Sequence, residues 1–395
     1  MHPIYSPGVT TASRASSPRR VLVSCGEPSG DLYAGDLVHH LRDLVDVDVF
    51  GLGGDRLEAE GGRLLAHVRD LAVVGLLEVL RHIRRLRSVF RSVLEEVDRE
   101  RPGVAVLVDY ADFNLRLARE LKRRGIPVVY YVSPQVWAWR RGRIHAIREN
   151  VAHMVVIFPF EEPLYREGGV PVTFVGHPLV DLARPAEDRA AFLAARGLDA
   201  AKPVLAVLPG SRPQEVAHNL PPIAGALRLL QARRADLQLV LAAAPSLDPA
   251  LFDRDLAGLP VTRVAGSTHA LLGAASAGIV ASGTATVEAA LMDLPMVVVY
   301  RLSALTYALG RPFVRVPHYA MANLIAGREV VKELIQRDFR PEAVAREVLA
   351  LLEDAGRRDR VRAGLDEVRA RLGPPGASAR AAAIVARVLG VGKKT

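Results

Sequence analysis

The feature that most constrains this chain is a repeated alternation of short apolar runs with helical stretches, which begins at Arg20. The apolar runs show no polar alternation, so both faces of each strand are expected to be buried, as in a parallel sheet with helices on both sides. The runs are VLVSC (21–25), VDVFGLGG (47–54), VAVLVDY (104–110), VVYYVSP (128–134), MVVIFPF (154–160), VTFVGHP (172–178), VLAVLPG (204–210), LQLVLAAA (237–244), VTRVAG (261–266), GIVASG (278–283) and MVVVYR (296–301).

One interruption of this alternation predicts two doubly wound α/β domains. Residues 181–203 show no strand pattern and carry proline near both ends, and the alternation restarts after them. The segments predicted are a disordered leader (1–19), a first domain (20–180), a linker (181–203), a second domain (204–340) and a helical tail (341–395) with a PPG break at 374–376.

Composition excludes several classes of protein. With 50% hydrophobic and 24% charged residues the chain is globular. The single cysteine, Cys25, allows no internal disulfide, and without clustered His and Cys no metal site is expected. Residues 1–19 lack the apolar core of a signal peptide, and no apolar run is long enough for a transmembrane helix.

The charge balance points to a polyanionic partner. A net charge of +9 fits a nucleic acid, an anionic membrane surface or a phosphorylated small molecule. Aromatic residues make up 5% of the chain, and no basic stripe is interleaved with aromatics, so nucleic acid is not expected as a partner.

Carboxylates follow two strands of the predicted first domain. Glu27 and Asp31 lie in GEPSGD (26–31), and Asp109 and Asp112 lie in DYADFN (109–114). Ligands of open parallel sheets bind at the carboxyl ends of the strands, where a carboxylate is placed to act as a general base. Helix capping explains Asp31 or Asp112 equally well, and an Asx turn explains Asp109.

The predicted second domain carries two candidate phosphate-binding segments. The strand at 204–208 runs into Gly210, Ser211 and Arg212, which offer backbone N–H groups, a hydroxyl and a guanidinium. Ser282, Gly283, Thr284 and Thr286 lie where a helix is expected to begin, and Glu288 follows in its first turn, suited to hold a ribose diol. A capping box is the other explanation of Glu288.

Two further regions are candidates for contact with an acceptor or a lipid. Both tryptophans fall in SPQVWAWRR (133–141), where Trp137 is either a ligand contact or surface packing. Residues 71–98 predict a helix whose arginines cluster on one face. It is either a core helix with a solvated face or a helix on an anionic membrane.

These segments, taken together and in order, resemble the lipid-A-disaccharide synthases, inverting glycosyltransferases of lipopolysaccharide assembly. The resemblance covers roughly residues 21–340. It is carried by GEPSGD (26–31), GLGGDRLEAEG (51–61), LAVVGLLEVL (71–80), DYADFNLRLA (109–118), YVSPQVWAWRRGRI (131–144), FPFE (158–161), PVTFVGHPL (171–179), LPGSR (208–212), SGTATVEAAL (282–291), YRLSALTY (300–307) and NLIAGREVV (323–331). This chain has Tyr110-Ala111 where the family usually has Ala-Pro.

The resemblance implies a fold of the glycosyltransferase B type, with two Rossmann-like domains facing a cleft, and no metal or other cofactor. It implies transfer of 2,3-diacylglucosamine from UDP-2,3-diacylglucosamine to the 6-hydroxyl of 2,3-diacylglucosamine 1-phosphate, giving a β(1→6) disaccharide and UDP with inversion. It also implies a cytoplasmic protein held peripherally at the inner membrane. A homodimer is left open.

The residues carried over fall into three groups. The expected base is Asp112, supported by Glu27 and with Asp109 as the alternative. The UDP-binding set adds Asn323 to the residues named above, and the acceptor and lipid set comprises Ser29, Asp31, Val74, Leu76, Leu77 and Trp137. The competing functions are another UDP-sugar transferase, or a UDP-N-acetylglucosamine 2-epimerase, on the same fold.

Overall fold

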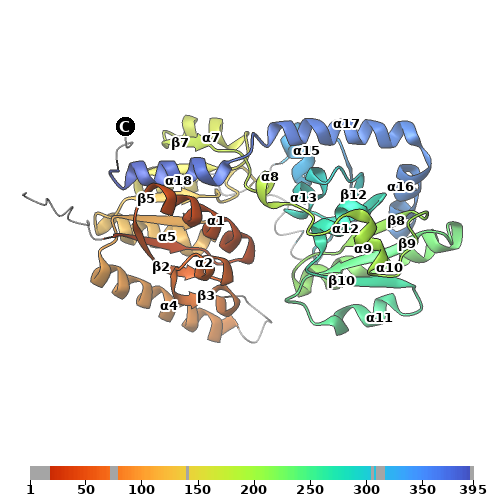
Figure 1. Ribbon diagram of the computed structural model, residues 1–395, viewed down its shortest axis with the longest axis horizontal. Helices are drawn as coiled ribbons and strands as arrows, with labels where there is room; N and C mark the ends of the chain where they lie inside the picture. Colours follow the sequence, from red (N-terminus) through yellow and green to blue (C-terminus); the bar gives the residue numbers. More distant parts are fainter. Residues whose placement is uncertain (1–17, 72–78, 139–141, 304–306, 308–315, 392–395) are drawn as a thin grey trace, which may run out of the picture. The chain divides into compact units, whose positions relative to one another are not determined.

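The computed structural model describes residues 18–71, 79–138, 142–303, 307 and 316–391, which form two parallel sheets with flanking helices (Figure 1). The predicted leader lies outside the described residues up to position 17, and Arg19 already belongs to the first strand. Two doubly wound α/β domains are therefore confirmed.

The first sheet has the strand order β3-β2-β1-β4-β5-β6-β7. Its strands are β1 (Arg19–Ser24), β2 (Val47–Gly53), β3 (Arg63–His67), β4 (Val104–Val108), β5 (Val128–Tyr131), β6 (His153–Val156) and β7 (Val172–Phe174). Its helices are α1 (Pro28–Leu44), α2 (Asp55–Ala59), α3 (Val68–Leu71), α4 (Val79–Glu100), α5 (Ala111–Arg123), α6 (Arg143–Asn150), α7 (Glu161–Glu167) and α8 (Leu179–Leu182).

The second sheet has the order β10-β9-β8-β11-β12-β13. Its strands are β8 (Val204–Leu208), β9 (Gln238–Ala243), β10 (Val261–Ala265), β11 (Ala277–Ala281), β12 (Met296–Tyr300) and β13 (Lys332–Ile335). The helices after α8 are α9 (Arg189–Ala194), α10 (Pro213–Arg233), η1 (Pro249–Phe252), α11 (Asp253–Leu256), α12 (Thr268–Ala274), α13 (Ala285–Leu291), α15 (Met321–Ala326), α16 (Pro341–Glu353), α17 (Ala355–Arg371) and α18 (Ala377–Val388). Of these, α18 lies at the first sheet, where Ser378 Oγ is 3.5 Å from Tyr131 Oη of β5.

Each sheet reverses its strand order once, and this reversal fixes where a ligand fits. In the first sheet the chain leaves β1 for β2 and later returns to β4 on the other side of β1; in the second it does the same around β8 and β11. Because parallel crossovers are right-handed, the helices on the two sides of the reversal cover opposite faces. A crevice at the carboxyl ends of the strands then opens between β1 and β4, and between β8 and β11.

The sequence analysis missed the strands β3 and β13, and both are edge strands. Neither segment is a pure apolar run, since β3 reads RLLAH and β13 reads KELI. The edge strands β7 and β10 were predicted, so the polar residues within β3 and β13 account for the difference; a central strand such as β4 is apolar and buried throughout.

The helical tail contributes to both sheets. The helix α17 packs against α13, α15 and α16 of the second sheet (Figure 1). After Gly373 and Gly376, both with positive φ, α18 follows, and its Arg380 Nε donates to the carbonyl of Val175 at 2.9 Å. By the density of internal contacts the described chain divides into residues 18–129 with 382–391, and residues 130–381.

Candidate active site

A glycine and a tyrosine bring together the two carboxylate segments of the first sheet. Gly26 follows β1 and Tyr110 follows β4, and a Cβ on Gly26 would lie 2.3 Å from the Tyr110 ring. The ring therefore rests on the Gly26 backbone. It also stacks on Phe113, with ring centroids 5.3 Å apart. Burial and, next, the charge of Glu27 raise the pKa of Tyr110, so Glu27 lies close to this ring.

The segment after β4 is held in a strained conformation. Asp109 and Tyr110 have φ values of 46° and 49°, in the left-handed region that side chains with a Cβ rarely adopt. The side chain of Asn114 stabilises it: Nδ2 lies 2.9 Å from the Asp109 carbonyl and 3.1 Å from the Ser24 carbonyl, and Ser24 Oγ donates to Oδ1 at 2.7 Å. Strain of this kind concentrates at functional sites.

The candidate carboxylates have different surroundings. Asp112 is exposed in the first turn of α5, while Glu27 is half-buried at the N-cap of α1 without capping that helix. Asp31 is buried, and its carboxylate accepts the N–H groups of Gly54 at 2.6 Å and Leu57 at 3.2 Å. Asp31 thus holds the start of α2, an arrangement that the sequence analysis did not foresee.

In the second sheet, a glutamate occupies one of the expected phosphate-binding loops. Glu215 Oε2 accepts the N–H groups of Ser211 at 3.1 Å and Arg212 at 3.3 Å, and Arg212 Nη1 donates to Oε1 at 3.0 Å. Gly210 has φ 131°, and a Cβ there would lie 2.7 Å from the Glu215 Cβ. The sequence analysis missed Glu215, although Pro213 followed by Glu215 at the third helical position is a helix-start signal.

The segment after β11 divides into exposed and structural residues. Thr284 is exposed, and a Cβ added to Gly283, which has φ 144°, would have no described residue within 4 Å. Thr286 is buried, and its hydroxyl donates to the Gly283 carbonyl at 2.8 Å. Ser282 Oγ donates to the Tyr319 carbonyl at 2.7 Å. Gly283 and Thr284 thus form the accessible part, and Thr286 shapes the turn beneath them.

Asn323 is buried and its amide is fully used within the protein. Its Oδ1 accepts the N–H groups of Val330 and Val331, and its Nδ2 donates to the Val331 carbonyl and to Glu333 Oε1. An asparagine side chain has no further hydrogen-bonding capacity. In this structure Asn323 thus has no free donor or acceptor for the UDP contact expected of it, and it holds the segment from Val330 to Glu333. Glu333, which the sequence analysis missed, also accepts the N–H groups of Tyr319 and Ala320.

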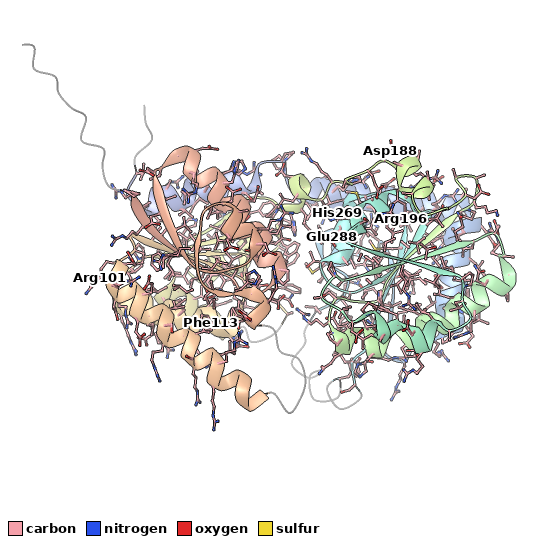
Figure 2. The ribbon with its side chains drawn as sticks, turned by 60° about the horizontal axis from the view of Figure 1, so that its bottom comes forward. Arg101, Phe113, Asp188, Arg196, His269 and Glu288 are labelled. Carbon is pink, nitrogen blue, oxygen red and sulfur yellow. The ribbon has the colours of Figure 1, made fainter. Side chains whose placement is uncertain are left out.

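Glu288 is paired with a histidine that the sequence analysis missed. His269 Nε2 lies 2.9 Å from Glu288 Oε1, joining α12 to α13 (Figure 2). The hydrogen bond to Glu288 raises the pKa of His269, and a contact with the backbone of Arg184 adds to this. Because the imidazole is held by Glu288 and by the Arg184 backbone, it fixes the orientation of the Glu288 carboxylate.

Trp137 belongs to an aromatic cluster at the carboxyl edge of the first sheet. Its ring meets Phe160 edge to face at 5.2 Å, and Phe160 stacks on Phe158 at 5.5 Å. Trp137, Phe158 and Phe160 are all half-buried, so the cluster retains an accessible apolar surface. Ser29 is half-buried in the first turn of α1. Val74, Leu76 and Leu77 lie outside the described residues.

Within the described ranges, the acidic, histidine and cysteine side chains form no group of three suited to a metal ion. No helix in that part of the chain is both long and apolar enough to cross a membrane. Cys25 is buried, and burial raises the pKa of its thiol.

Known proteins are similar to this chain in sequence and in fold. The family described as "Lipid-A-disaccharide synthetase" matches residues 21–386. A lipid-A-disaccharide synthase from Koribacter versatilis is 46% identical over 359 residues, which is 89% of this chain and 93% of that protein.

Two solved structures share the fold at low identity. A kitacinnamycin glycosyltransferase has a TM-score of 0.63 at 16% identity, covering 94% of this chain and 100% of its own. The S. aureus MnaA–UDP complex has a TM-score of 0.66 at 12% identity, covering 95% and 98%. The fold is therefore of the glycosyltransferase B type.

The His269–Glu288 pair predicts a histidine that titrates above its ordinary value of 6.5. Glu288→Gln should lower this pKa, which histidine NMR measures, with His269→Gln assigning the signal. Since the folded-state pKa is raised, the pair stabilises the protein below the ordinary value, and this contribution is lost as the pH rises through the folded value. The exposed Glu342 on α16 supplies the control variant Glu342→Gln; a His269 pKa insensitive to Glu288→Gln would contradict the pairing.

Proposed function

Because the chain belongs to the lipid-A-disaccharide synthase family, we propose that its two sheets divide the substrates of this transfer between them. The protein is a glycosyltransferase of lipid A biosynthesis that forms a disaccharide and uses a UDP-sugar. The donor proposed is UDP-2,3-diacylglucosamine and the acceptor is 2,3-diacylglucosamine 1-phosphate, joined through the acceptor 6-hydroxyl with inversion at the anomeric carbon and release of UDP.

The second sheet is the proposed donor site. Gly283 and Thr284 offer backbone N–H groups and a hydroxyl at the point where the strand order reverses, and Arg212 carries a charge at the end of the neighbouring strand β8. Glu288, oriented by His269, would accept both ribose hydroxyls. The N–H groups and hydroxyl of Gly283 and Thr284, with the Arg212 guanidinium, would stabilise the negative charge that grows on the departing diphosphate. The S. aureus MnaA protein, which has the same fold, was solved with UDP, and this supports a UDP-sugar as the donor.

The first sheet is the proposed acceptor site, with Asp112 as the general base. The observation that carries this assignment is the exposure of Asp112 directly after the strained Asp109–Tyr110 turn, at the strand reversal between β1 and β4. Asp112 would take the proton of the 6-hydroxyl as its oxygen attacks the anomeric carbon. Glu27, close to the Tyr110 ring at the same strand reversal, is the proposed supporting group of this site.

The alternative of a 2-epimerase is not favoured. The two solved structures named above are 12% and 16% identical to the chain, so they show a shared fold and no activity, whereas the disaccharide synthase of Koribacter versatilis shares 46% identity over nearly its full length. An assay of disaccharide and UDP formed in equal amounts from the two acylated sugars tests the proposed reaction directly.

Asp112→Asn should lower kcat about 100- to 10,000-fold, because a general base contributes a factor of that order. The substitution removes the base but leaves an exposed position, so UDP affinity and the melting temperature should stay unchanged. Glu120→Gln, on the same helix α5, is the matched control. Turnover of soluble Asp112→Asn near the parent rate would overturn the assignment, and a comparable loss in Asp109→Asn alone would move the base to Asp109.

Arg212→Ala should weaken UDP binding about 10- to 100-fold, the usual effect of losing a hydrogen bond to a charged group. Uridine lacks the diphosphate, so its affinity should not change. Calorimetric titration with both ligands makes the comparison, with Arg233→Ala at the other end of α10 as the control. Equal losses for UDP and uridine would show that Arg212 does not act on the diphosphate.

We also place the protein at an anionic membrane surface. Arg84, Arg85, Arg87 and Arg91 are exposed on α4, while Val93 and Val97 of the same helix are buried. Only Arg85 of these four arginines has a carboxylate partner among the described residues, Asp70 at 2.9 Å. The apolar residues 71–77 directly precede this helix, so an apolar segment and a cationic face adjoin in the sequence.

Binding to anionic vesicles should therefore weaken with salt and about fivefold for each arginine removed from this face, since each contributes about 1 kcal/mol near such a surface. Co-sedimentation of Arg84→Glu/Arg87→Glu and of Val74→Asp measures the effect. Arg228→Glu/Arg233→Glu on α10 carries the same change in net charge. Vesicle binding that is absent in the parent, or lowered equally by the control, would count against the membrane role.

A further inference from the structure

A buried carboxyl group lies at the carboxyl edge of the first sheet, and the proposed reaction does not use it. Glu161 is the first residue of α7 and is 1% exposed. Glutamate is almost never buried to this extent without specific partners, because removing its charge from water is costly. One partner is local: the Phe158 N–H donates to Glu161 Oε2 at 3.1 Å.

The other partner comes from the loop after β5. The Trp137 side chain donates a hydrogen bond to the Glu161 carboxyl group. Ser133 Oγ donates to the Pro134 carbonyl at 2.8 Å and lies 2.7 Å from Tyr165 Oη of α7. One carboxyl group thus ties the loop after β5 to the loop after β6.

This loop needs such support because it begins under strain. Val132 has φ 63°, a left-handed conformation that is a genuine outlier for a β-branched residue. Such conformations persist only where the surroundings determine them strongly. The buried Glu161 carboxyl group with its hydrogen bonds, called the anchor below, therefore sets the position of Trp137. Because Trp137 contacts Phe160, the anchor also sets the accessible aromatic surface.

Glu161 is also the group of this cluster that changes charge near neutral pH. Burial raises the pKa of Glu161 to about 8. The titratable groups nearest to it are Tyr165 of α7, whose pKa burial raises further still, and His177 after β7, whose ring contacts Phe158 and whose pKa burial lowers to about 3. On α7, Glu162 and Arg166 pair with each other at 3.1 Å.

We propose that Glu161 is a positioning residue for the acceptor: its buried carboxyl group holds Trp137 and the loop at residues 133–138 in the arrangement that the acylated acceptor binds. This inference rests on the proposed function, in which the carboxyl edge of the first sheet takes the acceptor. Glu161 itself does not touch the substrate, because it is buried beneath the aromatic cluster.

Tryptophan fluorescence tests the anchor without any substrate. Trp137 and Trp139 are the two tryptophans of the chain, so Trp139→Phe leaves Trp137 as the single reporter. Its emission should shift with pH in one transition near the Glu161 pKa of about 8. Glu161→Gln, which mimics the protonated carboxyl group, should abolish the transition, and Glu162→Gln should keep it. No transition in the parent, or one that survives Glu161→Gln, overturns the proposal.

Unfolding curves give a second measurement on the same variants. Since the folded-state pKa of Glu161 is raised, its contribution to stability is present below the ordinary value of 4.5 and is lost as the pH rises towards 8. Glu161→Gln should flatten this decline. If Glu161→Gln fails to fold, Trp137→Phe removes the hydrogen bond between Trp137 and Glu161 instead. This variant lacks the fluorescent reporter, so it is tested through its acceptor KM.

Steady-state kinetics test the role in acceptor binding. Glu161→Ala and Trp137→Phe should each raise the acceptor KM about fivefold, the effect of about one lost hydrogen bond, with kcat and the donor KM unchanged within about twofold. An acceptor KM that stays at the parent value while the fluorescence transition is lost would overturn the positioning role. Failure of the parent protein to form any disaccharide would instead overturn the proposed function, and the fluorescence result would still decide whether the anchor exists.

Discussion

Buried carboxamides hold the strand ends of both sheets, and the candidate site depends on them. Asn114 on α5 joins the end of β1 to the end of β4 through Ser24 and Asp109. Asn219 on α10 joins the end of β8 to the end of β12, donating to the Pro209 carbonyl at 2.9 Å and accepting the Arg301 N–H at 3.0 Å. Parallel strands end in backbone groups without a sheet partner, and an amide both donates and accepts, so one side chain can satisfy two strands at once.

This arrangement separates the polar residues at the strand ends into two kinds. Asn323, Thr286 and Asp31 are buried and use their polar atoms to shape loops, whereas Thr284 and Asp112 are exposed at the same edges. The hydrogen-bonding atoms of these buried residues already have partners within the protein, so they are not available to a ligand that binds and dissociates. The exposed residues can serve it because the buried ones keep the backbone fixed.

The sequence predicts the central strands well, but not the side-chain pairings at the candidate site. The apolar runs mark β1, β4, β8 and β11, and the motifs that follow them lie at the two strand reversals. The edge strands β3 and β13 carry too weak a pattern. The contacts of Glu215 are local, and helix-capping rules could have predicted them. His269 and Glu288 are 19 residues apart in the sequence and lie on different helices, and hydrophobic periodicity does not predict such a contact.

Of the six described non-glycine residues with positive φ, Arg101 and Asp293 follow helices, and the other four lie at strand ends. Asp109 and Tyr110 after β4, Val132 after β5 and Gln336 after β13 all have positive φ at the carboxyl end of a strand. A left-handed residue there turns the chain sharply, so the next side chains face the edge of the sheet instead of continuing along it. The conformation costs about 1–3 kcal/mol for each residue. Buried partners such as Asn114 and Glu161 offset that cost, which explains why polar burial and backbone strain occur together at these strand ends.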